Sequence, residues 1–430
     1  MTKKLLDDCF LHDKDRLRHD AAVTLLKSRI TPITDAEIVA IDDASGRILV
    51  DAAAALRPVP AHTNSAVDGY AVSSQHYDVN TGGRFAVSAR AAAGRPLDAS
   101  PPSDTAVRIF TGAAIPEHFD TVVMQEDCTV ETGADGGVLH VVIPGGLKKG
   151  ANVRRVGEDV AAGEVLFGPG TLLRPQDVAA LASIGVANVN CHGRVRVAIV
   201  SSGDEVIRAG SRALNPGEVF DANAPMLNAL ARITGADVSD LGVWPDDATE
   251  IERRLADAAQ RFDLILTSGG ASRGEEDHML GALDALGRRH MWQLAVKPGR
   301  PLMFGQIGDT IMVGLPGNPV AVFVCYLMYV YPMLRRLGGG HWPEPRRFTL
   351  PAAFEMPKRK TGRREFLRGF YVTGADGQMA VDKYPRDGSG LISGLRAAQG
   401  LIDIGEDVTG VAKGDPVAFI PFTEFGILDA

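Results

Sequence analysis

The chain has 430 residues, more than one hydrophobic core usually organises, so we expect two to four domains. Hydrophobic residues make up 45% and charged residues 23%, which is typical of a soluble globular protein. The net charge of −8 argues against nucleic acid and anionic membranes as main partners, because both require a basic surface. The net charge does not exclude the binding of small anions, because local loops bind them whatever the net charge of the protein.

The sequence shows no sign of a targeting or membrane segment. Residues 1–18 are charged and lack an apolar stretch, so no secretory signal is expected. The longest apolar run, 320–330, is too short to span a bilayer and is followed by Pro332. The cysteines are dispersed without paired spacing, at Cys9, Cys128, Cys191 and Cys325. These features favour a cytoplasmic protein without disulfides or a zinc site.

The first part of the chain predicts one helix and then a run of strands. Residues 20–29 carry an apolar side at helical spacing. Between Ser65 and Pro144 short apolar segments alternate with Gly and Pro turns, and strands are expected at 84–89, 106–110, 121–125 and 138–143. This pattern predicts a small β-rich domain.

From residue 194 strands alternate with helices. Strands are predicted at 194–200, 238–243, 262–266 and 310–315. Helices are predicted through 226–233, opened by Asp221 or Asn223, and then at 249–261 and 320–334. Asn318 and Pro319 suit the cap and first turn of the last helix. The alternation predicts an α/β domain with a mostly parallel sheet, and the pattern becomes β again from 347 to 422.

Three glycine turns follow strands of this sheet: Ser201–Asp204, Thr267–Gly270 and Leu315–Pro319. In a parallel sheet, ligands bind where the carboxyl ends of the strands meet. Backbone N–H groups and helix N-termini can approach an anion closely at such turns. One turn alone is more often structural, but three in one domain predict a phosphate or oxyanion site. Its candidate residues are Ser202, Gly203, Asp204, Ser268, Gly269, Gly270, Pro316, Gly317, Asn318 and Pro319.

Charged side chains accompany the turns. Lys297 and Arg300 lie in the rigid sequence KPGR and suit a phosphate or an oxyanion. Acids follow the same strands: Asp204, Glu205, Asp246, Asp247, Glu275, Glu276 and Asp277. Acids beside an anion indicate Mg²⁺, which prefers oxygen ligands, although a solvated surface is the alternative for each acid alone. The histidines show no metal-binding spacing, and no Ser/His/Asp nucleophile arrangement is apparent.

Two acidic segments lie outside the predicted α/β domain. The sequence NSAVDGYA places Asp68 between a polar cluster and a glycine. The sequence RRVGED places Asp159 after two arginines. On spacing alone, an ordinary turn and a helix cap explain these segments as well as a functional site does.

The whole chain resembles the molybdopterin molybdenumtransferase family, which includes the E domain of gephyrin. The resemblance rests on the order of eight motifs: NSAVDGYA from Asn64, TGAAIP from Thr111, VVMQED from Val122, NVRRVGEDV from Asn152, SSGDEV from Ser201, TSGGASRGEED from Thr267, AVKPGRP from Ala295 and LPGNPVA from Leu315. It implies an elongated homodimer with four domains in each subunit. These are a discontinuous linking domain (1–57 with 145–190), a β-rich domain (58–144), an α/β molybdopterin-binding domain (191–337) and a C-terminal β-barrel (338–430).

The resemblance also implies the reaction. Adenylylated molybdopterin and molybdate give the molybdenum cofactor and AMP with the help of Mg²⁺. Transient contact with the adenylyltransferase or with molybdoenzymes is also expected. Asp68 and Asp159 would face the glycine turns of the other subunit. The implied catalytic residues are Asp68, Thr111, Asp159, Glu205 and Asp277, and the implied metal ligands are Asp68, Asp159, Glu205, Asp247 and Asp277. Ser272 and Ser389 join Lys297, Arg300 and the turns as ligand-binding candidates. Arg364, Arg368 and Ser393 are weaker candidates.

Three positions depart from the family pattern. Thr63 stands where the family usually has an acid, Arg300 replaces a lysine, and Leu280 replaces another. These changes concern anion binding rather than the fold. Two other functions therefore stay open: the preceding adenylyl transfer, and a paralogue or scaffold that binds molybdopterin without inserting molybdate.

Overall fold

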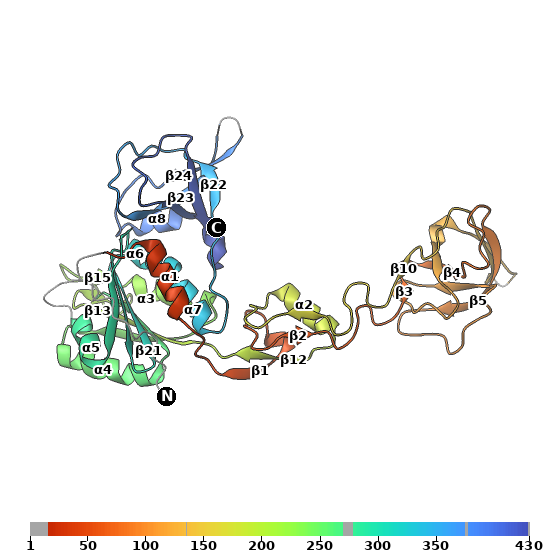
Figure 1. The fold of residues 1–430 in the computed structure, drawn as a ribbon, viewed down its shortest axis with the longest axis horizontal. Helices are drawn as coiled ribbons and strands as arrows, with labels where there is room; N and C mark the ends of the chain where they lie inside the picture. The colour runs from red at the N-terminus through yellow and green to blue at the C-terminus, as the bar shows by residue number, and fades with distance from the viewer. Residues whose placement is uncertain (1–15, 135, 270–277, 375–376, 429–430) are drawn as a thin grey trace.

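The computed structural model describes residues 16–134, 136–269, 278–374 and 377–428. Figure 1 shows an elongated molecule with a β-rich unit at one end and an α/β unit with a C-terminal β unit at the other. The described part of the chain starts beside the α/β unit, where helix α1 (His19–Arg29) lies, passes out to the β-rich unit and returns. Segments far apart in sequence therefore lie side by side along the thin connection.

The β-rich unit is a six-stranded sheet in the order β7-β4-β6-β5-β9-β8. Its strands are β4 (Gly69–Val72), β5 (Gly83–Ala91), β6 (Ala106–Ile109), β7 (Thr121–Met124), β8 (Thr129–Thr132) and β9 (Val138–Ile143). The four strands expected from the alternation are confirmed as β5, β6, β7 and β9. Two apolar clusters form its core, because alternate side chains of a strand point to opposite faces.

Three antiparallel strand pairs make up the thin connection. They are β1 (Ala36–Ala40) with β12 (Asn188–His192), β2 (Ala53–Ala54) with β11 (Val165–Phe167), and β3 (Asn64–Ser65) with β10 (Val153–Arg154). Helix α2 (Pro175–Ser183) packs on them through Leu181 and was not expected from the sequence. Pro175 starts the helix, and Asp177 accepts a hydrogen bond from the Arg174 N–H at 2.8 Å.

The expected linking domain begins at residue 1, yet α1 packs elsewhere. Ala22, Leu26 and Ile30 belong to the core of the α/β unit. The segment before the helix also joins this side, since the Leu17 N–H donates to the Gln293 carbonyl at 3.2 Å. The start of the described chain therefore supports the α/β unit.

The α/β unit contains a six-stranded sheet in the order β16-β13-β17-β21-β20-β18. The strands are β13 (Arg196–Ser202), β16 (Asp237–Trp244), β17 (Leu264–Ser268), β18 (Arg288–Gln293), β20 (Pro301–Ile307) and β21 (Thr310–Leu315). Strands β16, β13, β17 and β21 are parallel, as predicted, whereas β20 runs antiparallel to both of its neighbours, β21 and β18. A two-residue turn at Gly308 and Asp309 joins β20 to β21, so the sheet is mixed.

Helices cover both faces of this sheet. Helices α4 (Ala248–Arg261) and α5 (His278–Leu286) pack on one face. Helices α1, α3 (Asn223–Ile233), α6 (Pro319–Cys325) and α7 (Tyr331–Leu337) pack on the other. A π-helical turn, Tyr326–Val330, joins α6 to α7, where the sequence predicted one regular helix. Residues Pro319–Leu337 are apolar enough to cross a membrane, but 89% of this stretch is buried inside the protein, as in a core helix.

The C-terminal unit is a third six-stranded sheet, in the order β19-β23-β25-β26-β22 with β24 paired to β23. Its strands are β19 (Val296–Lys297), β22 (Phe348–Pro351), β23 (Arg364–Thr373), β24 (Met379–Lys383), β25 (Gly400–Ile404) and β26 (Pro416–Pro421). The family resemblance implies a barrel here; Ala352, the residue after β22, forms a bridge with Val381 of β24 and so connects β22 to β24. Helix α8 (Ile392–Ala397) lies towards the α/β unit. Strand β19 comes from the α/β part of the sequence, so the two units share a sheet.

A candidate ligand-binding cavity at the glycine turns

The three glycine turns meet at one edge of the α/β sheet. Ser201 of β13 is the register partner of Ser268 of β17, and Ser268 is the register partner of Leu315 of β21. All three strands are parallel, so their carboxyl ends and the turns after them lie together. The parallel pairing from which the sequence analysis placed these turns together is present in the structure.

The second turn packs directly on the first. Gly269 has a φ of +90°, which side chains rarely adopt. A Cβ atom at this position would lie 2.7 Å from the Ser202 carbonyl oxygen. Gly203 also has a positive φ, of +126°. Glycine therefore allows the two backbones to approach each other and leaves room for a ligand above them.

Asn223 ties the second turn to the third. Its Nδ2 donates to Ser268 Oγ at 2.7 Å and to the Gly317 carbonyl at 2.7 Å. Asp221 caps α3, because its Oδ1 accepts the Asn223 and Ala224 N–H groups. The sequence offered either residue as the cap, so the structural role of the Asn223 side chain was missed.

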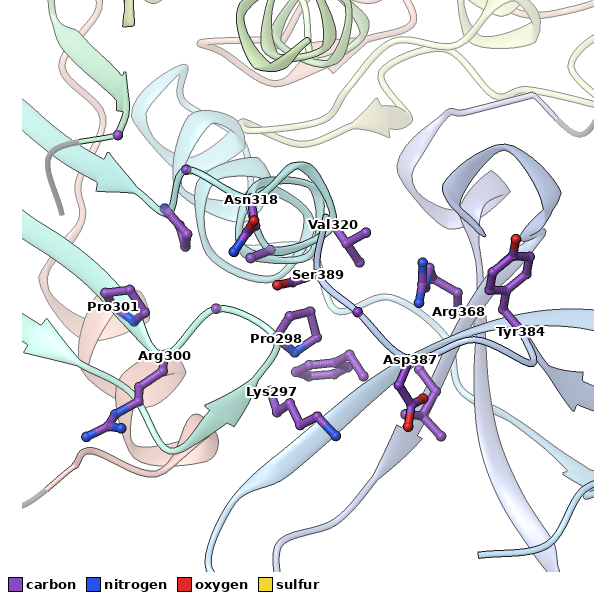
Figure 2. Close-up of a pocket in the computed structure, with 18 of the residues that line it drawn as sticks. Lys297, Pro298, Arg300, Pro301, Asn318, Val320, Arg368, Tyr384, Asp387 and Ser389 are labelled. Carbon is purple, nitrogen blue, oxygen red and sulfur yellow. The ribbon is translucent and has the colours of Figure 1, made fainter. Parts of the chain in front are cut away.

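A cavity of about 810 Å³ opens above the turns, between the α/β and C-terminal units. Ten of the predicted binding or catalytic residues line it: Ser202, Gly203, Glu205, Gly269, Lys297, Arg300, Pro316, Gly317, Asn318 and Ser389. Figure 2 shows Asn318 and Ser389 near each other on one side and Lys297 on another. Asp204, Ser268 and Pro319 belong to the turns but do not line the cavity. Gly270, Ser272 and Asp277 lie outside the described residues.

The wall from the C-terminal unit was mostly missed. It includes Phe366, Leu367, Arg368, Lys383, Tyr384 and Asp387. Arg368 had been a weak candidate, and its guanidinium donates to the Leu391 carbonyl at 2.9 Å and the Arg386 carbonyl at 2.8 Å. The same guanidinium lies 5.0 Å from the centroid of the Tyr384 ring. No motif in the sequence indicated that these residues would face the turns.

Lys297 is held on the shared sheet. Lys297 is the register partner of Glu365 in β23, and its Nζ lies 3.4 Å from Glu365 Oε2. Gly299 permits close packing on α6, since a Cβ there would lie 2.3 Å from Cys325 Sγ. Figure 2 shows the Arg300 side chain directed away from Lys297. The two predicted cations therefore occupy different parts of the cavity wall.

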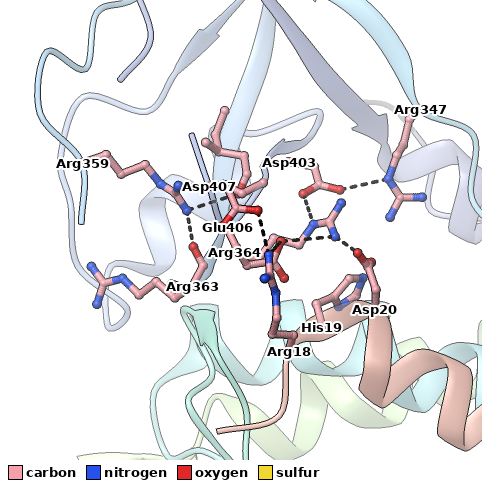
Figure 3. A network of polar contacts seen from close by, with 12 residues as sticks. Arg18, His19, Asp20, Arg347, Arg359, Arg363, Arg364, Asp403, Glu406 and Asp407 are labelled. Carbon is pink, nitrogen blue, oxygen red and sulfur yellow. Dashed lines mark hydrogen bonds and ion pairs between the residues drawn. The ribbon is translucent and has the colours of Figure 1, made fainter. Parts of the chain in front are cut away.

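A network of ion pairs connects the C-terminal sheet, which supplies this part of the cavity wall, to helix α1 (Figure 3). Asp403 accepts hydrogen bonds from Arg364 Nε at 2.6 Å and Arg347 Nε at 2.9 Å. Arg364 also donates to Asp20 of α1 at 2.7 Å. Charged groups therefore join helix α1 to the C-terminal sheet, and Arg364 directly precedes Glu365 in β23.

We expect Asp403→Ala to lower the free energy of unfolding by about 3–5 kcal/mol, because it removes the buried acid that pairs with Arg364, whose side chain is 15% exposed. The Asp403 side chain is 1% exposed. Asp407→Ala is the matched control, since Asp407 pairs with Arg18 but is 85% exposed. That control should cost no more than about 1 kcal/mol. Urea denaturation followed by circular dichroism measures both, and equal costs would contradict the role given to Asp403.

One predicted metal ligand lies elsewhere. Asp247 caps α4, where its Oδ1 accepts the Glu250 N–H at 2.8 Å, and it does not line the cavity. Its neighbour Asp246 lines the cavity instead. Asp246 and Asp204 exchange hydrogen bonds from their backbone N–H groups to each other's carboxylates, at 3.2 and 3.3 Å. Of this acidic pair, which the sequence singled out, Asp246 is the member that lines the cavity.

Asp68 and Thr111 form a second polar site in the β-rich unit. Asp68 Oδ1 accepts hydrogen bonds from the Thr111 N–H at 2.8 Å and the Thr111 hydroxyl at 2.7 Å. These two bonds, the backbone one first, hold the pKa of Asp68 below its usual value. Figure 1 places this unit at the opposite end of the molecule from the glycine turns.

Asp159 is exposed and lies away from Asp68 along the β3–β10 pair. Strand β3 runs antiparallel to β10, with Asn64 opposite Arg154. Asp159 follows Arg154 and its N–H donates to the Val59 carbonyl, whereas Asp68 lies beyond the other end of β3. Within the described ranges of one chain, no three His, Cys, Asp or Glu side chains are grouped to hold a metal ion.

We expect Thr111→Val to raise the pKa of Asp68 and to narrow the pH range of any activity that needs its carboxylate. A lowered pKa keeps Asp68 ionised as the pH falls, so losing the hydroxyl bond moves the acid limb of the pH profile to higher pH. The pH dependence of kcat/KM is the measurement. Thr111→Ser keeps the hydroxyl and should keep the wild-type profile, and a valine variant with that same profile would refute the assignment.

Three family models match the chain in order. They are the MoeA N-terminal region (domain I and II) over residues 17–185, a probable molybdopterin binding domain over 198–336, and the MoeA C-terminal region (domain IV) over 349–422. The second match spans the glycine turns, and the third spans most of the opposite cavity wall.

Relatives cover nearly the whole chain. A molybdopterin molybdenumtransferase of Haemophilus influenzae is 35% identical over 390 residues, which are 90% of this chain and 94% of that protein. Molybdopterin molybdenumtransferase 2 of Mycobacterium tuberculosis is 33% identical over 409 residues, 92% of this chain and 96% of that protein. The crystal structure of a moeA protein from Pyrococcus horikoshii matches with a TM-score of 0.79 and 27% identity, covering 95% of this chain and 100% of that one. The chain belongs to the molybdopterin molybdenumtransferase family.

Proposed function

We propose that this protein inserts molybdate into adenylylated molybdopterin and releases AMP and the molybdenum cofactor. The observation that carries the proposal is the cavity of about 810 Å³, which joins three glycine turns to a wall with cations. A cavity of this size suits a nucleotide-bearing ligand. Membership in the family supplies the reaction, and the geometry supports it.

Each wall of the cavity suits a different part of such a ligand. The glycine turns bring backbone N–H groups close to a bound phosphate. Lys297, Arg300 and Arg368 add positive charge at separate parts of the cavity lining. Tyr384, which is half-buried, offers an aromatic surface for a planar ring. Cleaving a phosphoanhydride in this setting depends on positioning and electrostatic stabilisation, so no protein nucleophile is needed.

Mg²⁺ fits the carboxylates of this site if two subunits combine. Glu205 and Asp246 line the cavity, while Asp68 and Asp159 lie at the far end of the same chain. The proposed ligands are Asp68, Asp159, Glu205 and Asp277, with Asp246 in place of the predicted Asp247. When bound, the metal would neutralise the phosphate charge that develops during cleavage.

The proposal therefore includes a homodimer. One chain does not bring Asp68 and Thr111 to its own cavity, since the β-rich unit lies at the other end of the molecule. In a two-fold dimer of an elongated subunit, the β-rich unit of one chain can reach the cavity of the other. We also propose a cytoplasmic location and transient contact with the adenylyltransferase or with molybdoenzymes.

The test is one assay with the purified protein, Mg²⁺, adenylylated molybdopterin and molybdate. The proposal expects AMP release that depends on molybdate and molybdenum retained in the pterin product. Adenylyl transfer is the second candidate, supported only by the glycine turns, and it would instead consume ATP and molybdopterin without molybdate. Binding of molybdopterin without AMP release would favour a binding protein and refute the insertion activity.

A further inference from the structure

Two arginines in the β-rich unit stack on one aromatic ring beside the Asp68–Thr111 pair. The guanidinium carbon of Arg90 lies 4.5 Å from the centroid of the Phe110 ring, and that of Arg108 lies 4.7 Å from it. Phe110 directly precedes Thr111. The stacked arginines therefore lie next to the polar site that the proposed function assigns to the other subunit.

The two arginines are also direct neighbours across the sheet. Arg90 in β5 is the register partner of Arg108 in β6. Like charges in this arrangement destabilise a sheet unless an anion offsets them. Arg108 donates to the Gly69 carbonyl at 3.0 Å and to Gln125 Oε1. Arg90 is exposed, and among the described residues it has no acid or hydrogen-bond acceptor of its own.

The cavity at the glycine turns has little free positive charge for a ligand with several phosphates. Four cations line it, and so do three carboxylates: Lys297, Arg300, Arg368 and Lys383, against Glu205, Asp246 and Asp387. Lys297 is paired with Glu365, and Arg368 donates to two backbone carbonyls. Within the described part of the lining, only Arg300 and Lys383 have no such partner.

We propose that Arg90 and Arg108, stacked on Phe110, form an anion-binding site that takes the phosphate groups of the substrate held in the cavity of the partner subunit. This inference rests on the proposed function and its dimer. The ring supports both guanidiniums, and Arg90, which has no acceptor among the described residues, has N–H donors available for the ligand. The site also offsets the repulsion that Asp68 would exert on a phosphate. Arg90 and Arg108 bind here and take no part in bond cleavage.

Arg90→Gln is the test variant, and Arg84→Gln is its matched control. Arg84 lies on the same strand but is paired with Glu131, so both variants remove one charge from β5. We expect Arg90→Gln to raise KM for adenylylated molybdopterin about tenfold, with kcat within about twofold of wild type. Arg84→Gln should leave both constants unchanged, and Arg90→Lys should recover part of the loss. Equal KM values for the two glutamine variants would overturn the inference.

Binding of inorganic pyrophosphate, measured by calorimetry on the full-length protein, separates this inference from the proposed function. Weaker binding by Arg90→Gln alone supports the anion site even if the wild-type protein releases no AMP, which would refute the insertion activity instead. Unchanged pyrophosphate binding overturns the anion site. If Arg90→Gln dissociates the dimer while pyrophosphate binding is unchanged, an acidic segment of the second copy is the partner and the inference is wrong.

Discussion

An Asp68→Asn variant is expected to release AMP about 10²–10³-fold more slowly than the wild-type protein. Thr111 holds one oxygen of this carboxylate with two hydrogen bonds, and the pKa of Asp68 lies below its usual value. Asparagine keeps the shape and can accept the same bonds, but it removes the negative charge that the proposed metal requires. The loss should appear in kcat, measured as molybdate-dependent AMP release at saturating substrate.

Asp78→Asn is the control for this variant. Asp78 is also in the β-rich unit, and its carboxylate accepts the Asn80 N–H at 2.7 Å, which lowers its pKa in the same way. It has no place in the proposed site, so the control should turn over at the wild-type rate. Wild-type turnover by Asp68→Asn would remove Asp68 from the mechanism.

An Asn223→Ala variant is expected to lose about 10²-fold in kcat/KM, because small shifts of positioning groups are costly in catalysis. Asn223 is the side chain that joins Ser268 in the second turn to Gly317 in the third. Without it the two turns lose their common donor, and the buried Ser268 hydroxyl loses a partner. The change should also lower the free energy of unfolding by about 1–3 kcal/mol.

Asn228→Ala provides the comparison on the same helix. Asn228 is part of α3 and bonds the exposed Arg232, away from the turns. It should keep wild-type kcat/KM and change stability by less than about 0.5 kcal/mol. Steady-state kinetics on both variants decide the matter, and equal kinetics would show that Asn223 does not organise the turns.

The sequence predicted the elements whose pattern is local. The strands 84–89 and 138–143 and the helix 249–261 were found because hydrophobic periodicity and caps identify them directly. The three glycine turns were placed together correctly, since parallel strands bring their carboxyl ends to one edge. Helix α2, which has nine residues, and the hairpin of β20 were missed.

The candidate site was predictable only in part, since its second wall depends on tertiary packing. The pairing of β19 with β23 brings Arg368 and Tyr384 to the turns, and no spacing in the sequence encodes this contact. The choice between Asp246 and Asp247 depended on which carboxylate caps α4. The resemblance to the family supplied Asp68 and Thr111, which the residue pattern alone left open.

The central claim is that the site forms between two subunits, and mixed dimers test it most directly. A chain with Asp68→Asn keeps an intact cavity, and a chain with Lys297→Ala keeps an intact β-rich unit. Dimers purified with one chain of each kind, carrying different tags, contain one site with both halves intact if the β-rich unit works on the partner. The account predicts about half of wild-type AMP release from the mixed dimer and almost none from either variant alone. A mixed dimer as inactive as its parents would contradict it.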